Sequence, residues 1–345
     1  MSTRRLATGG QIDRGRPITF TWDGKTRTGY SGDTLASALI ANREEVIGRS
    51  FKYHRPRSVM SAGVEESGAI VTVGSGDRTE SNVKATMQEL YDGLEARGQN
   101  AWPSVRFDLG AVNNLLGRFL AAGFYYKTFM RPRFLWHTLY QKILRQFAPG
   151  GRIHWEASTH GAYDQRYAHP DVLVAAGGPS GMAAALGAAD AGAAVMLVEH
   201  EAEMGGHLRW GGSDDLTDLA GLIATVVAHP GIEVLLDSTV TGRYDHNWVA
   251  VVQRSHPIAP ERLIKARVGT LVVAPGLVER PYVFAGNDTP GVMLSGAARR
   301  LINLWAVKPG TRAVVLSANA QGDAAIADLF ARIISEARIL EGENS

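Results

Sequence analysis

The clearest chemistry in this sequence lies in a glycine-rich segment, residues 171–199. It predicts an apolar strand, a glycine turn, a small-residue helix beginning near Pro179, and a second strand ending at Glu199. Binding the pyrophosphate and ribose of an adenine dinucleotide requires this order of elements. Backbone amides and the positive end of the helix dipole would face the phosphates, and Glu199 would accept hydrogen bonds from a ribose diol. Because a carboxylate there repels a 2′-phosphate, NAD or FAD is favoured over NADP.

The glycines of the turn are expected to have separate roles. Gly178 would let the backbone approach the pyrophosphate, and Gly181 would let the helix pack against the strand. Ala176 stands where the G-x-G-x-x-G pattern has its first glycine, and a Cβ there is tolerated only if its φ stays negative. A doubly wound sheet with a decayed nucleotide site is therefore the alternative. A membrane span is disfavoured, because the stretch contains several glycines, Pro179 and Asp190.

A second glycine pair follows the acidic residue and offers another close approach of the backbone to a cofactor. The predicted cofactor-binding residues are Ala176, Gly177, Gly178, Pro179, Ser180, Gly181, Glu199, His200, Gly205, Gly206 and Gly276. No convincing acid–base pair or nucleophile accompanies them, so the sequence identifies no catalytic residue.

Composition excludes several other kinds of chemistry. The 345-residue chain has 36 basic and 34 acidic residues, so its charge requires neither nucleic acid nor an anionic membrane as a partner. It has no cysteine, which excludes thiolate-bound clusters, redox disulfides and cysteine nucleophiles. The ten histidines are scattered, and no metal site is predicted. The first residues lack the apolar segment of a secretory signal, so we expect a cytoplasmic protein.

Residues 1–100 are predicted to form a small β-grasp domain. Strand-like alternation on both sides of Asp23-Gly24 indicates a β-hairpin. A helix capped by Asp33 or Thr34 and a strand at 69–73 follow. The domain would be ferredoxin-like but cluster-free, since it contains no cysteine.

A basic loop lies where ferredoxins have the segment that precedes their cluster ligands. Residues 48–57 mix cations with aromatic side chains. Two interpretations stay open: contact with a phosphate, a flavin or an acidic partner chain, or an ordinary solvated loop with aromatic anchors.

Residues 101–168 are predicted to form a helical connector rich in aromatic side chains. Pro132 divides its apolar part, 113–147, into two helical pieces. A wide apolar face is typical of buried core, but the aromatic content favours a subunit interface. The polar run that follows, up to Gln165, is predicted to be a linker.

Residues 169–345 are predicted to form a Rossmann-type FAD/NAD-binding domain. Strands at 234–236 and 250–253 would form an antiparallel crossover piece. A last strand at 312–316 precedes a helix from about 323 to 340 with no strand after it, so the domain is expected to be incomplete. The predicted fold class is therefore α+β for the first domain and α/β for the second, truncated at the C-terminus.

Several segments outside the glycine turn carry a resemblance to a known family. They are residues 10–14, 29–41, 48–57, 89–103, 122–130 and 286–294. Together with the turn, they resemble the alpha subunits of heterotetrameric sarcosine oxidases, within the flavin-dependent amine and opine dehydrogenase group. The resemblance covers nearly the whole chain.

This resemblance implies an oxidoreductase acting on CH–NH donors, built from several subunits, that demethylates sarcosine. The products would be glycine, a one-carbon unit passed to tetrahydrofolate, and hydrogen peroxide. In this family the alpha subunit holds NAD, FMN lies between the two large subunits, and another subunit carries FAD and the pocket for the N-methyl amino acid. The implied partners are beta, gamma and delta subunits, and the isolated chain is expected to be inactive.

The family's alpha subunits continue beyond this length, so we expect a truncated, fragmentary or split subunit. Ala176 and Pro275 depart from the family's pattern and bear on cofactor affinity. Three other functions stay open: a scaffold that keeps the nucleotide fold only for its shape, a self-sufficient FAD-dependent NADH oxidoreductase, and a subunit of a related opine or amine dehydrogenase.

Overall fold

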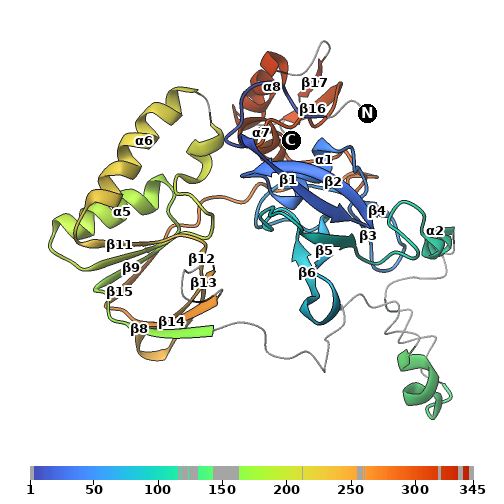
Figure 1. The fold of residues 1–345 in the computed structure, drawn as a ribbon, viewed down its shortest axis with the longest axis horizontal. Coiled ribbons are helices and arrows are strands. Elements are labelled where there is room, and N and C mark those ends of the chain that lie inside the picture. The colour runs from blue at the N-terminus through green and yellow to red at the C-terminus, as the bar shows by residue number, and fades with distance from the viewer. Residues whose placement is uncertain are drawn as a thin grey trace. The chain divides into compact units, whose positions relative to one another are not determined.

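In the computed structural model the chain forms two compact units (Figure 1). Unit 1 comprises Met1–Ser158 and Glu279–Ser345, and unit 2 comprises Thr159–Val278. The structure describes residues 4–115, 131–142, 163–211, 213–254, 261–317, 320–332 and 337–341, together with the single residues 117, 123 and 259.

Unit 1 is built on a five-stranded sheet in the order β2-β1-β7-β5-β6. The strands are β1 Asp13–Trp22, β2 Lys25–Ser31, β5 Ile70–Val73, β6 Glu80–Lys84 and β7 Glu95–Gly98. β1 and β2 form the predicted hairpin, and Asp23 and Gly24 both have the positive φ that its tight turn requires. β7 pairs with β1 in parallel, so the sheet is mixed.

Helix α1, Leu35–Ala41, follows the hairpin as predicted. The Thr34 side chain accepts a hydrogen bond from the Ser37 amide, and the Ser37 hydroxyl accepts one from the Thr34 amide. This reciprocal capping box fixes where the helix begins. All residues of α1 are buried, as are Phe20 and Trp22 of β1, so the core of the domain lies between this helix and the sheet.

The basic segment 48–57 forms a small hairpin whose arginines are engaged within unit 1. β3 Gly48–Arg49 pairs with β4 Pro56–Arg57. Arg55 Nη2 donates to Asp288 Oδ1 at 2.7 Å, and Arg57 forms an ion pair with the same carboxylate. The segment therefore binds a distant part of its own chain, a role that neither interpretation of the sequence included.

Residues 279–345 fold with the first part of the chain, not with the nucleotide domain as predicted. This part holds α7 Ser295–Asn303, β16 Ala313–Ser317, α8 Ala320–Arg332 and β17 Ala337–Glu341. Lys308 N donates to Arg4 O and Leu6 N donates to Ala306 O, both at 2.8 Å. The predicted domain boundaries therefore differ from the two units, because such long-range backbone pairings have no local sequence signal.

The strand β17 corrects a further expectation. It pairs in parallel with β16 and follows α8, so the βαβ unit is complete. The predicted helix runs to Leu340 and leaves no strand after it. That prediction was wrong because residues 337–341 are few and mix apolar with charged side chains, so their periodicity fits a strand as well as a helix.

Unit 2 contains a parallel sheet in the order β11-β10-β9-β15. Its elements are β9 Val172–Ala175, α5 Pro179–Asp190, β10 Val195–Val198, α6 Ser213–Ala228, β11 Ile232–Leu235 and β15 Thr270–Val273. Val174 and Leu197 share a core with Met182 and Leu219 of the helices. α5 and α6 therefore cover one face of the sheet (Figure 1), as a Rossmann-type domain requires.

A second sheet, in the order β12-β13-β14-β8, packs against the other face. Its strands are β8 Tyr163–Ala168, β12 Ser238–Tyr244, β13 Trp248–Arg254 and β14 Glu261–Arg267. Two predictions were wrong here. β11 belongs to the parallel sheet rather than to an antiparallel piece, and the end of the predicted linker forms β8, parallel to β14. β8 lies at a sheet edge and is largely polar, so its pattern resembles a linker.

The aromatic-rich connector is described only in part. It includes α2 Val112–Leu115 and a π-helical turn at Trp136–Tyr140. Other short elements are 3₁₀ helices at Gly76–Arg78, Leu109–Ala111, Gly206–Trp210 and Asp245–Asn247. Most of the predicted apolar face of 113–147 lies outside the described residues, so the subunit interface stays a prediction. Among the described helices, none has the length and apolar character needed to cross a membrane.

Candidate functional site

The glycine turn joins β9 to α5 at the carboxyl end of the parallel sheet. Gly178 is the N-cap of α5, with φ −72° and ψ 178°, and no side chain caps this helix. Pro179 occupies the first helical turn, where its missing N–H is not needed. The amides at the start of α5 and the positive end of the helix dipole are therefore available to an anion.

Close packing of α5 on β9 requires glycine at position 181, as predicted. A Cβ built on Gly181 would lie 1.9 Å from the carbonyl oxygen of Ala176. No side chain fits in that space. Gly181 therefore sets the distance between helix and strand, and with it the position of the helix N-terminus.

Two glycine segments converge where α5 begins. Gly205 N donates to Gly177 O at 2.9 Å, and Gly206 has a positive φ of 53°. A Cβ on Gly206 would lie 3.2 Å from Gly178 Cα, whereas a Cβ on Gly178 would meet no atom within 4 Å. The tertiary structure thus places the second glycine pair beside the first, and the backbone at Gly178 faces open space.

Ala176 adopts a conformation that contradicts the expectation of a negative φ. Its φ is +89°. An L-residue with positive φ is strained by roughly 1–2 kcal/mol, because its Cβ crowds the backbone. The expectation was wrong because the turn keeps the path suited to a glycine, with the Ala176 carbonyl packed against Gly181. The alanine is therefore accommodated by strain and not by a change of the turn.

Ala176→Gly is accordingly expected to raise the free energy of unfolding by about 1 kcal/mol. The gain from relieved strain exceeds the added freedom of the unfolded chain. Urea unfolding at neutral pH measures it. Ala175→Gly in β9, where φ is ordinary, is the matched control and should lower stability by about 1 kcal/mol. A destabilised Ala176→Gly protein would contradict the strain described for this turn.

Glu199 is buried at the end of β10 and is bound by the protein itself. Its Oε2 accepts a hydrogen bond from the Gly177 amide at 2.6 Å, and its Oε1 accepts one from the Glu201 amide at 2.9 Å. His200 Nδ1 lies 2.8 Å from Oε1. Burial raises the pKa of this carboxyl, but the hydrogen bond from His200, the amides and the His200 charge outweigh burial, so the pKa lies below its ordinary value.

This geometry gives Glu199 a role beyond the predicted one, because it ties β10 to the glycine turn. Its side chain is only 4% exposed, and both oxygens face protein donors. Oε2 accepts from the Gly177 amide and retains a lone pair. The predicted hydrogen bonds from a ribose diol stay a prediction that depends on that lone pair.

The other predicted residues lie around the same turn. Ser180 is exposed on the first turn of α5, and His200 is partly exposed beside Glu199. Gly276 has a φ of +77°, and a Cβ there would meet no atom within 4 Å. Gly276 lies three residues after the end of β15. Between them, the Ala274 amide donates to Ala175 O at 2.9 Å, which continues the pairing of β15 with β9. The sequence-predicted residues are therefore brought together at the carboxyl end of the parallel sheet.

Two side chains that support the site were missed by sequence reasoning. Met204 is buried, and its Cγ would lie 3.0 Å from a Cβ on Gly177, so it packs against the turn. Arg209 Nη1 donates to Glu201 Oε2 at 2.8 Å, and Arg209 also pairs with Glu203 at 2.9 Å. These contacts hold the segment that carries the second glycine pair. Only the proximity of Met204 to that pair in sequence could have indicated its role.

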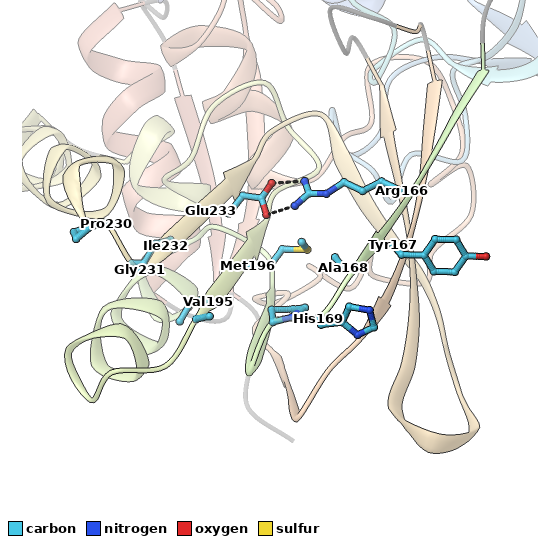
Figure 2. A pocket seen from close by; sticks show the side chains of 12 residues that line it. Arg166, Tyr167, Ala168, His169, Val195, Met196, Pro230, Gly231, Ile232 and Glu233 are labelled. Carbon is cyan, nitrogen blue, oxygen red and sulfur yellow. Dashed lines mark hydrogen bonds and ion pairs between the residues drawn. The ribbon is translucent and has the colours of Figure 1, made fainter.

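A hollow of about 490 Å³ lies at the opposite end of the parallel sheet, where its strands begin (Figure 2). Residues that precede or open the strands line it, among them His169, Val195 and Ile232. Arg166 Nη2 of β8 donates to Glu233 Oε2 of β11 at 2.8 Å beside it. Because the glycine turn lies at the carboxyl ends of the same strands, this hollow is separate from the candidate site. In the described part of the chain, no group of three or more His, Asp or Glu side chains is placed to hold a metal ion.

Two family models match the chain. A 2Fe-2S iron-sulfur cluster binding domain matches residues 15–101, and an FAD dependent oxidoreductase matches residues 171–263. The chain therefore combines a ferredoxin-like domain with an FAD-oxidoreductase-type domain. A [2Fe–2S] cluster is held by Cys thiolates, and the chain has no cysteine, so its residues do not fit this group.

The chain is similar over most of its length to sarcosine oxidase alpha subunits. It is 46% identical over 339 residues to Sarcosine oxidase subunit alpha of Rhizobium meliloti (strain 1021), which is 93% of this chain and 34% of that protein. It is 33% identical over 340 residues to Sarcosine oxidase subunit alpha of Corynebacterium sp. (strain P-1), which is 93% of this chain and 30% of that protein. The chain thus spans about one third of the length of these relatives.

A solved structure shares the fold. The crystal structure of L-proline dehydrogenase from P. horikoshii matches with a TM-score of 0.65 at 20% identity, covering 96% of this chain and 55% of that chain. At this identity the likeness establishes the fold alone.

Proposed function

Because the chain belongs by sequence to the family of sarcosine oxidase alpha subunits, we propose that unit 2 binds an adenine dinucleotide at its glycine turn. The chain spans about one third of the length of these relatives. The observation that carries the proposal is the convergence of Gly178 and Gly206 at the uncapped start of α5. A pyrophosphate there would accept hydrogen bonds from the first amides of α5 and interact with the helix dipole.

FAD is the dinucleotide that the family match to residues 171–263 favours, and NAD is the alternative. Both carry the same ADP part, which is all that the glycine turn and Glu199 would contact. The open space at Gly178 and the backbone approach at Gly206 fit this group. When bound, it would supply redox chemistry if it is FAD, whereas NAD would have the non-redox role implied by the resemblance.

The wider activity that the family resemblance implies is also part of the proposal. The complete enzyme would oxidise the N-methyl group of sarcosine, giving glycine, a one-carbon unit passed to tetrahydrofolate, and hydrogen peroxide. The amine would bind in a partner subunit of the beta type, FMN would lie at an interface with a partner, and gamma- and delta-type subunits would complete the assembly. The ferredoxin-like domain would work without a cluster, since it lacks cysteine. A related opine or amine dehydrogenase subunit is the alternative within the same class.

An inert scaffold is the second candidate, and two observations favour it. Ala176 strains the turn, and the Glu199 carboxylate is already engaged by protein donors. In a scaffold, both features would serve shape alone. Direct ligand binding separates the two functions.

The test is a thermal-shift titration of the full chain with FAD and with NAD. Free ligand at about 100 times its Kd stabilises the folded state by about 2.7 kcal/mol, and we expect a corresponding rise in Tm. The ligand that gives the rise at the lower concentration identifies the cofactor. The purified chain by itself should not oxidise sarcosine.

Gly178→Ala is the matched variant for this titration. Its Cβ meets no protein atom within 4 Å, so Tm without ligand should fall by no more than about 2 °C. The same Cβ would occupy the space of the pyrophosphate, and the ligand-induced rise should need at least about 10-fold more dinucleotide. No rise in the wild-type chain, or an equal rise in Gly178→Ala, would favour the scaffold.

A further inference from the structure

The loop between β4 and β5, residues 58–69, folds around the side chain of its own Glu66. Glu66 is 2% exposed. Its Oε2 accepts hydrogen bonds from the amides of Met60, Ser61 and Ala62 at 2.8, 2.9 and 3.3 Å, and its Oε1 accepts from the amides of Gly68 and Ala69 at 2.6 and 3.3 Å. Five backbone amides from both ends of the loop therefore converge on one buried carboxylate.

A buried carboxylate needs compensation, because its transfer from water is otherwise strongly unfavourable. Within the described part of unit 1, the amides supply it together with the Ser61 hydroxyl, which donates to Oε2 at 3.5 Å, and no ion pair to Glu66 is formed. Backbone amides that converge in this way form a concave anion site, an arrangement that also surrounds phosphates and iron–sulfur clusters. The loop thus has the chemistry of an anion-binding loop.

The place of this loop in the fold identifies which anion it would otherwise hold. It lies inside the segment that matches a 2Fe-2S cluster binding domain, directly after the basic hairpin at 48–57. The spacing C-x₄-C-x₂-C of plant-type ferredoxins spans about nine residues, which a loop of this length can accommodate. In this chain no position of the loop is a cysteine.

We infer that the Glu66 carboxylate replaces an iron–sulfur cluster as the anion around which this loop folds. The amides that would face cluster sulfurs face a carboxylate, which is attached to the chain and needs no assembly. The loop is closed tightly over it, since a Cβ on Gly68 would lie 2.2 Å from Ser58 O. The ferredoxin-like domain accordingly keeps its shape without metal.

The test compares Glu66→Gln with Glu65→Gln in the full chain. Glu65 is the exposed neighbour of Glu66 and is the matched control. Glu66→Gln removes the charge and turns an amide group towards backbone donors, so its Tm should fall by about 10 °C, whereas Glu65→Gln should stay within about 2 °C of wild type. Equal Tm values for the two variants would overturn the inference.

Small-molecule rescue separates an anion's role from simple packing. Glu66→Ala leaves a space that formate can enter, and about 100 mM formate should recover at least about half of the lost Tm by ligand linkage. Formamide, a neutral molecule of the same shape, should recover none. Equal recovery by both would show packing rather than charge, and would also overturn the inference.

Two measurements on the wild-type chain test the inference about Glu66 if Glu66→Ala does not fold. A metal chelator should leave Tm unchanged, and the amide hydrogens of residues 60–62, 68 and 69 should exchange slowly, as hydrogen-bonded amides do. A Tm lowered by the chelator, or fast exchange at these amides, would contradict the replacement of a cluster by Glu66. Because the loop lies in unit 1, this result is independent of nucleotide binding in unit 2.

Discussion

Gly181→Ala is expected to lower the free energy of unfolding of unit 2 by about 3 kcal/mol. The added Cβ would lie 1.9 Å from the Ala176 carbonyl oxygen, which belongs to the backbone and cannot rotate away. Relief requires α5 to move from β9, and this movement displaces the helix N-terminus. Dinucleotide binding should therefore be lost together with stability. Urea unfolding followed by circular dichroism measures the first effect, and a thermal-shift titration measures the second.

Gly187→Ala is the matched control in the same helix. Gly187 is exposed on α5, and a Cβ there meets no atom within 4 Å. Replacing glycine by alanine in a helix interior usually stabilises it by about 1 kcal/mol. The two alanine variants should thus change stability in opposite directions. A Gly181→Ala protein as stable as Gly187→Ala would contradict the close contact between α5 and β9.

Glu199→Ala is expected to lower the free energy of unfolding by about 3 kcal/mol, because the substitution leaves one buried and one partly buried amide without an acceptor. These are the amides of Gly177 and Glu201. Loss of the hydrogen bond from the Gly177 amide also detaches the glycine turn from β10, so dinucleotide affinity should fall at the same time. Glu203→Ala is the control, since that side chain is 63% exposed and its ion pair with Arg209 contributes at most about 1 kcal/mol.

The pH dependence of stability tests the charge of Glu199 directly. Its folded-state pKa lies below the unfolded value of about 4.3, so its contribution is complete above that pH and is lost as the pH falls through the folded-state pKa. Glu199→Gln lacks this titration. The stability difference between wild type and Glu199→Gln should therefore be largest at neutral pH and should shrink below about pH 4. A constant difference across this range would contradict the pKa shift.

Local patterns predicted the parts of this fold that depend on neighbouring residues. Positive φ at Asp23 and Gly24, the Thr34 cap and the glycine turn each follow from sterics or from hydrogen bonds that reach only a few residues along the chain. Short continuous apolar runs on both sides of the turn likewise indicate the buried parallel strands of a Rossmann-type sheet. The strained φ of Ala176 was predicted wrongly, because residue type alone does not reveal that the surrounding packing fixes the turn.

Sequence by itself therefore determined most kinds of elements, apart from β8 and β17, together with the absence of thiolate chemistry and the residues at the carboxyl end of the parallel sheet. The tertiary structure decided which distant segments meet: Asp288 with Arg55, Gly206 with Gly178, and residues 279–345 with the first domain. It also showed that Glu199 faces the turn and that Glu66 is enclosed by amides. Contacts between residues far apart in sequence depend on the path of the whole chain, and a local pattern of residue types carries no record of that path.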